Sequence, residues 1–86
     1  MSRRYKWFFT EEWDEGGVIH LTKYGKRKVS EISEIRYQME RYSPYDYCDS
    51  VECDSEEQYD SYLKCRIEDR DPSNRYEIND NEKEEA

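Results

Sequence analysis

The sequence is poor in glycine, proline and histidine, and it has no long hydrophobic run. Its 86 residues include three glycines, two prolines and one histidine. Three glycines do not supply the glycine-rich loop with which nucleotide-binding enzymes hold phosphate groups. No apolar stretch approaches the roughly 20 residues of a membrane-spanning helix, and the first residues lack the apolar segment of a signal peptide. We therefore expect a cytoplasmic protein that neither spans a membrane nor binds a cofactor.

Residues that can build a core are also scarce. Hydrophobic residues make up 34% of the chain and charged residues 42%, against about 45–50% and 25% in average domains. Nine tyrosines, two tryptophans and two phenylalanines supply much of the apolar material. A tyrosine ring is buried while its hydroxyl stays in water, which suits a thin core that doubles as a contact surface. We expect one small domain at 1–78, whose marginal burial a homodimer would complete, and a disordered acidic tail at 79–86.

Two segments rich in aromatic and β-branched residues predict an N-terminal hairpin. Residues 5–10 and 18–24 both have this character, and the second segment alternates between two faces. Gly16 and Gly17 lie between them and supply the positive φ that a turn needs. The sequence therefore predicts two antiparallel strands at the start of the chain.

Helical spacing predicts a first helix over residues 30–42. Ser30 has a hydroxyl that can cap the first turn, and Pro44 prevents continuation after the last turn. The apolar residues between them recur at intervals of three or four and share one face: Ile32, Ile35, Met39 and Tyr42.

The second half of the chain admits two interpretations, and both give an α+β fold. After an irregular connection at 45–54, Ser55 and Gln58 have the spacing of a capping box and predict a helix over 55–69. The fold is then a hairpin packed on two helices. Alternatively, residues 61–78 alternate as two paired strands and complete a four-stranded antiparallel sheet with one helix. The expected core is the same in either case: Trp7, Phe9, Ile19, Leu21, Ile32, Ile35, Met39, Leu63 and Ile67.

The net charge of −8 is unevenly distributed along the chain. Residues 1–28 carry seven basic and four acidic side chains, whereas residues 29–86 carry seven basic and eighteen acidic ones. A field of that sign repels nucleic acids and membrane surfaces and attracts basic partners. The densest acidic stretch has a carboxylate every one to three residues: Asp46, Asp49, Glu52, Asp54, Glu56, Glu57 and Asp60.

Three cysteines and one histidine raise the question of a metal or a catalytic thiol. Zinc sites usually present their ligands as two closely spaced pairs, and here only Cys48 and Cys53 form such a pair, with Cys65 and His20 distant from it. A cysteine nucleophile needs a neighbouring base and a third orienting group, and the sequence indicates neither. We predict that the chain binds no metal and is not an enzyme.

Two alternative binding functions are open at this point. The hairpin combines basic residues such as Arg4 and Lys26 with aromatic ones such as Trp7, a composition that holds single-stranded nucleic acid. The −11 charge of the remaining chain makes direct nucleic-acid binding the weaker alternative. The second alternative is an adaptor recognised through acidic-flanked tyrosines, because Tyr59 between Gln58 and Asp60 suits phosphorylation.

Small size, strong acidity, abundant tyrosine and the lack of a catalytic motif together resemble the small phage-encoded inhibitors of host defence and nucleic-acid proteins. Anti-CRISPR proteins and DNA mimics are the best-known members, and the resemblance covers the character of the chain without a shared motif. It implies a protein that occupies the basic nucleic-acid-binding site of a partner in the host cytoplasm. The predicted partner-binding residues are the seven carboxylates of 46–60 together with the tyrosines interleaved among them, which are good interface anchors: Tyr47, Tyr59 and Tyr62.

Overall fold

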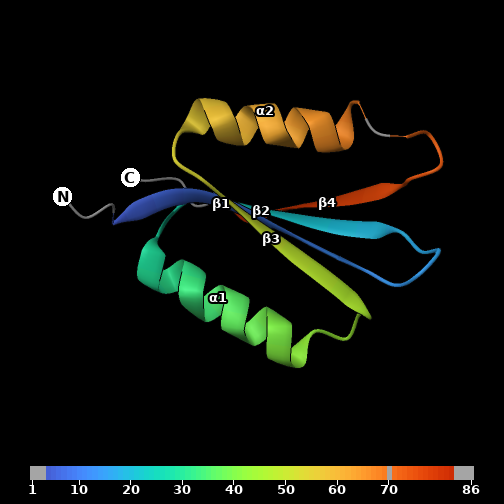
Figure 1. The fold of residues 1–86 in the computed structure, drawn as a ribbon, viewed down its shortest axis with the longest axis horizontal. Coiled ribbons are helices and arrows are strands. Elements are labelled where there is room, and N and C mark those ends of the chain that lie inside the picture. The colour runs from blue at the N-terminus through green and yellow to red at the C-terminus, as the bar shows by residue number, and fades with distance from the viewer. Residues whose placement is uncertain (1–3, 70, 83–86) are drawn as a thin grey trace.

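A computed structural model describes residues 4–69 and 71–82. Four strands form one mixed sheet, and two helices pack against it. The sheet order is β3-β1-β2-β4, with β1 antiparallel to both of its neighbours and β4 parallel to β2. Figure 1 shows the two helices on opposite faces of the sheet. The predicted α+β class with an N-terminal hairpin is confirmed. The elements run β1 Tyr5–Trp13, β2 Ile19–Lys28, α1 Val29–Tyr42, β3 Tyr47–Cys53, α2 Glu56–Ile67 and β4 Tyr76–Asp80.

The hairpin of β1 and β2 contains a bulge near its open end. The register shifts between Phe8 and Phe9, so that β2 has one more residue than β1 at this point. Gly25 lies at the bulge with a φ of +71°, a conformation that glycine adopts without steric cost. Its backbone N–H points inward and donates to the Tyr59 hydroxyl at 3.0 Å. The bulge therefore connects the hairpin to the second helix.

Helix α1 follows β2 without an intervening loop. Lys28 is the N-cap residue and makes no side-chain capping bond, and the Val29 N–H donates to the Arg4 carbonyl at 2.8 Å. The prediction that Ser30 caps this helix is wrong, because Ser30 lies within the first turn. Ile32 is the buried residue of the helix, and Phe8 is buried on the same side of the sheet. These two side chains form a small core beneath α1 that the larger core does not include.

Strand β3 occupies a segment for which the sequence indicates an irregular connection, so that prediction is wrong. It pairs with β1 along its whole length, from Trp13 opposite Tyr47 to Trp7 opposite Cys53. The strand lies at an edge of the sheet and is largely polar on one face. Polar and charged residues are typical of edge strands, because they discourage pairing with other chains. Because these residues are polar, the segment lacks the alternation of hydrophobic and polar residues that predicts a strand.

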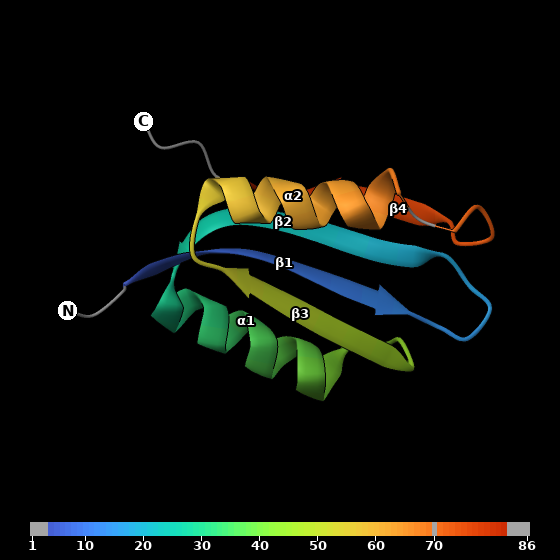
Figure 2. The same ribbon diagram turned by 45° about the horizontal axis from the view of Figure 1, so that its top comes forward.

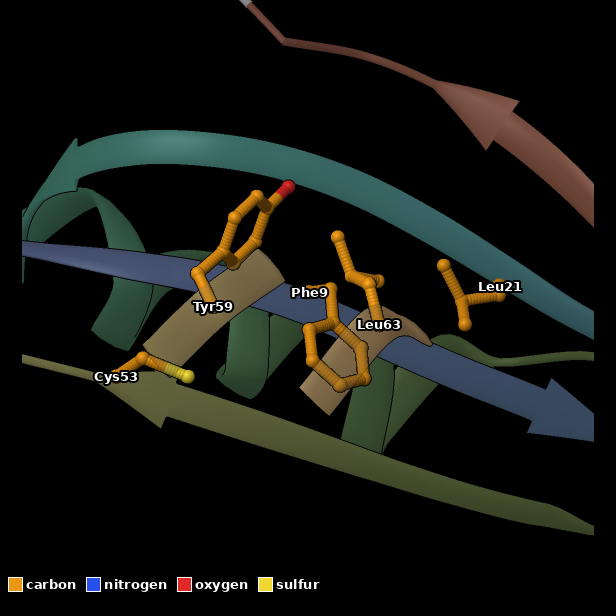
Figure 3. Close-up of a cluster of buried hydrophobic side chains, with 5 residues drawn as sticks. All are labelled: Phe9, Leu21, Cys53, Tyr59 and Leu63. Atoms are coloured by element: carbon orange, nitrogen blue, oxygen red, sulfur yellow. The ribbon is translucent and has the colours of Figure 1, made fainter. Parts of the chain in front are cut away.

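Helix α2 begins as its capping sequence predicts. The Ser55 hydroxyl accepts from the Gln58 N–H at 3.1 Å, and the Gln58 side-chain oxygen accepts from the Asp54 N–H at 2.9 Å. The alternative in which Leu63 belongs to a strand is therefore wrong for this segment. Figure 3 shows the main core between α2 and the sheet, built from one helix and three strands: Phe9, Leu21, Cys53, Tyr59 and Leu63.

The chain remains structured beyond residue 78, so the prediction of a tail beginning at residue 79 is corrected. Strand β4 continues to Asp80, and the Asn81 N–H donates to the Lys23 carbonyl at 2.8 Å. Glu82 accepts a hydrogen bond from the Tyr59 hydroxyl at 3.0 Å. Residues 83–86 of the predicted tail lie outside the described residues. In the described part of the chain, neither helix has the length and apolar character needed to cross a membrane.

Candidate partner-binding surface

Strand alternation divides the predicted acidic residues between the two faces of the sheet. Asp49 lies directly opposite Glu11, whose carboxylate accepts from Arg66 of α2 at 3.2 Å, so both carboxylates face α2. Glu52 lies opposite Phe8 on the other face and accepts from Arg36 of α1 at 2.6 Å. The seven carboxylates therefore do not form one continuous acidic face.

The remaining acids of this set gather around the start of α2. Asp54 is paired with Lys6 at 3.2 Å. Glu56 and Glu57 lie in the first turn of the helix, where the helix dipole favours negative charge. Asp60 follows Glu56 by one turn and therefore lies on the same side of the helix. The residues of this group are exposed, but part of their negative charge stabilises α2 itself.

The predicted tyrosines have different environments. Tyr59 is 1% exposed and its hydroxyl is bonded to Gly25 and Glu82, so its assignment to a partner surface is corrected. Its ring packs against Trp7 and Phe9, with centroids at 5.4 and 6.1 Å. The adaptor alternative loses its tyrosine for the same reason, because a buried hydroxyl is not accessible to a kinase. Tyr47 and Tyr62 are 46% and 42% exposed.

A smaller group of the predicted residues does lie together, at the outer edge of the α2 face. Tyr47 and Asp49 point to the same side of β3 because they are two residues apart, and Asp46 immediately precedes the strand. Tyr62 is one turn before Arg66 on α2 and therefore faces the same side, toward Glu11 and β3. We call this group the edge strip: Asp46, Tyr47, Asp49 and Tyr62.

The outer edge of β3 is unpaired in the described sheet but is partly shielded. Because β3 is the last strand in the sheet order, alternate backbone groups face away from β1. The outward N–H of Ser50 donates to the Asp49 carboxylate at 2.9 Å. This bond satisfies one donor that would otherwise be available to another strand, so at this position the edge presents a carboxylate in place of a backbone donor.

Trp13 also belongs to this surface, although it is not among the predicted partner-binding residues. Its ring is stacked on that of Tyr47, with centroids 5.7 Å apart and planes at 21°. Trp13 lies after the first predicted strand segment, 5–10, and its contact with Tyr47 depends on the register between β1 and β3. Its only sequence signal is the continued alternation of Trp7, Phe9, Glu11 and Trp13, which share one face of β1.

Three basic side chains of the hairpin form ion pairs within the molecule. Lys6 pairs with Asp54, Lys23 lies 3.7 Å from Glu82, and the nearly buried Arg27 lies 3.5 Å from Glu31. Internal pairing lowers the positive charge that the hairpin presents to a polyanion. It therefore weakens the alternative in which the hairpin binds nucleic acid.

The histidine and one cysteine lie in a single row across the α1 face of the sheet. The strand register places Glu12 between Cys48 and His20, so the thiol and imidazole are not adjacent. His20 Nδ1 lies 3.6 Å from a Glu77 carboxylate oxygen, and its ring packs against Tyr45 at 4.8 Å. Burial, followed by the negative charges of neighbouring carboxylates, raises the pKa of the Cys48 thiol. No group of three metal-ligating side chains is found in residues 4–69 and 71–82.

Comparison with known proteins gives no match: no family model, curated protein or solved structure is similar to this chain.

Proposed function

We propose that this chain is a non-enzymatic inhibitor that binds a basic, nucleic-acid-handling protein through its acidic, tyrosine-rich surface. It acts in the cytoplasm, in the manner of the phage-encoded inhibitors that its composition resembles. The observation that supports the proposal is the edge strip, which gathers two exposed acids, Asp46 and Asp49, and two exposed tyrosines, Tyr47 and Tyr62, along β3 and the adjacent side of α2.

The balance of paired and unpaired charge supports this function. Lys6, Lys23 and Arg27 pair with internal acids, and each pair is locally neutral, so the negative field arises from the carboxylates that have no basic partner in the described part of the chain. Several carboxylates form no ion pair with the basic side chains of the described residues: Asp46, Asp49, Glu56, Glu57 and Asp60. Exposed negative charge without internal compensation attracts a basic surface and speeds encounter with it.

The carboxylates and tyrosines of the proposed surface indicate the chemistry of the partner. Lysine and arginine side chains that bind DNA phosphates form charge-assisted hydrogen bonds, and a carboxylate accepts the same kind of bond. Exposed tyrosines add stacking surface and hydroxyl groups at modest entropic cost, as in other protein interfaces. A nucleic-acid-binding site meets both requirements, because it presents cations for the backbone and flat groups for the bases.

The test compares two charge-reversed variants of equal net charge. Each variant changes three exposed acids to lysine, and only one of them alters the proposed surface. Immobilised wild-type chain and both variants are incubated with host lysate, with and without duplex DNA, and the retained proteins are identified by mass spectrometry. The surface variant is Asp46→Lys, Asp49→Lys and Asp60→Lys, and the control variant is Glu34→Lys, Glu40→Lys and Glu68→Lys.

The proposal expects a nucleic-acid-binding protein that the wild type and the control variant retain, that the surface variant loses, and that DNA displaces. Loss from both variants in equal measure would show a nonspecific charge effect and contradict the proposal. Retention by all three chains would contradict it as well. Circular dichroism of the three chains verifies that each is folded.

A further inference from the structure

Three loops meet at the end of the molecule where the hairpin turns. Figures 1 and 2 show the β1–β2 turn, the α1–β3 connection and the α2–β4 connection together at this end. Hydrogen bonds link them: the Asp46 N–H donates to the Asp14 carboxylate at 2.9 Å, and the Ile19 N–H donates to the Arg75 carbonyl at 2.8 Å. This end of the molecule is therefore built from three loops that are distant from one another in the sequence.

The three loops enclose an open pocket of about 370 Å³, within the usual range for small-ligand sites. Trp13, Ile19 and Tyr47 provide its apolar lining, and Asp14 and Glu15 provide carboxylates. The other described lining residues are glycines of the turn and two neutral polar residues of the α2–β4 connection, so none of the lining side chains that the structure describes is basic. The pocket combines aromatic faces with two carboxylates that form no ion pair with a basic side chain of residues 4–69 and 71–82.

The protein already uses this chemistry to hold one of its own arginines. The guanidinium of Arg66 lies 6.0 Å from the centre of the Phe9 ring and donates to Glu11 at 3.2 Å. Phe9 and Glu11 lie on the same face of β1 as Trp13, which is the next residue on that face. In the described part of the chain, no basic side chain stacks on Trp13 or Tyr47.

We infer that this pocket binds an arginine side chain of the basic partner, an inference that rests on the proposed function. The guanidinium packs against the stacked pair of Trp13 and Tyr47 on a ring face that the pair leaves open, and its N–H groups are directed to the carboxylates of Asp14 and Glu15. Arginine suits this site better than lysine, because its planar group stacks on aromatic rings and forms paired bonds to carboxylates. The pocket adjoins Asp46 and Tyr47 of the edge strip and extends the acidic surface around the end of the sheet.

The two tryptophans of the chain make the inference directly measurable. Trp7 and Trp13 each give one indole N–H signal in a ¹⁵N–¹H correlation spectrum of the full chain, and only Trp13 lines the pocket. The probes are three blocked pentapeptides with arginine, lysine or citrulline flanked by two glycines on each side. Citrulline has the shape of arginine without its charge.

The arginine peptide is expected to move the Trp13 signal in a saturable manner and to leave the Trp7 signal in place. The citrulline peptide should give no saturable shift, and the lysine peptide should bind about two- to fivefold more weakly because it loses the stacking contribution. Equal shifts of both indole signals would overturn the inference. Equal binding of the arginine and citrulline peptides would overturn it too.

Variants test the two parts of the pocket separately. Tyr47→Leu should weaken binding of the arginine peptide about two- to fivefold, whereas Tyr42→Leu, which removes an exposed tyrosine of α1, should have no effect. Asp14→Asn removes charge and retains the oxygen that accepts the Asp46 N–H. It should weaken arginine binding, and Glu56→Gln at the start of α2 should not. Unchanged binding of both pocket variants would refute the assignment.

The outcomes distinguish failure of the pocket from failure of the proposed function. The peptide titration involves no partner, so it reports on the pocket alone. If the pocket fails while the surface variant still loses its partner, the acidic surface stands and its arginine site is wrong. If arginine binds here while the charge-reversed chains all retain the same proteins, the inhibitor function is wrong.

Discussion

The hydroxyl of Tyr59 joins three segments that are distant in the sequence, and its removal tests the packing of the whole α2 face. It accepts from the Gly25 N–H and donates to a Glu82 carboxylate oxygen, both at 3.0 Å. One oxygen atom therefore connects the bulge of β2, the second helix and the segment after β4 through hydrogen bonds. Tyr59→Phe retains the buried ring and deletes this atom alone.

The expected loss comes mainly from the backbone donor that remains. Gly25 is buried, so its N–H loses its partner without gaining one from water. An unsatisfied buried donor costs about 1–3 kcal/mol, and the bond to Glu82 is lost as well. We expect Tyr59→Phe to lower the free energy of unfolding by about 2 kcal/mol. In a domain of this size, that corresponds to a decrease in Tm of roughly 8–16 °C.

Thermal and urea unfolding followed by circular dichroism measure this loss. Tyr62→Phe is the matched control, because it makes the same change three residues later on the same helix at a tyrosine that is 42% exposed. Its free energy of unfolding should stay within about 0.5 kcal/mol of the wild type. If Tyr59→Phe is as stable as Tyr62→Phe, the bridging role assigned to the Tyr59 hydroxyl is incorrect.

Three further predictions concern pH, the C-terminal strand and the thiols. Burial, and then the charge of Glu82, raises the pKa of Tyr59 in the folded chain. The unfolded tyrosine releases its proton near pH 10, so the free energy of unfolding should fall as pH rises above about 10. Urea unfolding at pH 8 and pH 11 should show a smaller decrease for Tyr59→Phe than for the wild type. A chain that ends after Ser73 lacks β4 and Glu82 and should lose roughly 10 °C or more in Tm; an unchanged Tm would contradict the role of β4. Alkylation by iodoacetamide, mapped by mass spectrometry, should modify the exposed Cys65 before Cys53, which is buried and whose pKa is raised by burial and by Asp54; equal rates would contradict this burial.

The hairpin and both helices could be predicted because each has a local signal. In the first helix, apolar residues such as Ile32 recur every three or four residues, and in the second, Ser55 caps the first turn. Both signals link residues within about one helical turn of each other, so they can be recognised without knowing the tertiary contacts. Strand β4 was visible only as an alternative, and its parallel pairing with β2 was not predicted. Parallel partners are set by the path of α2 across the sheet, which no short segment of sequence encodes.

The candidate surface was less predictable, because it depends on strand register and helix rotation. Asp49 and Glu52 are three residues apart in sequence, and strand alternation sends them to opposite faces. Tyr59 and Tyr62 are also three residues apart, yet one is in the core and the other half-exposed. Trp13 joins the surface only through its pairing with Tyr47. Composition thus indicated the chemistry of the surface, and the fold determined which residues present it.

Competition between this chain and duplex DNA for the captured partner tests the central claim most directly. If the acidic surface occupies a nucleic-acid-binding site, the apparent dissociation constant of the chain rises in proportion to the DNA concentration, and binding weakens steeply between low and physiological salt. A complex that contains partner, DNA and this chain at once, with an affinity that salt does not alter, would contradict the claim.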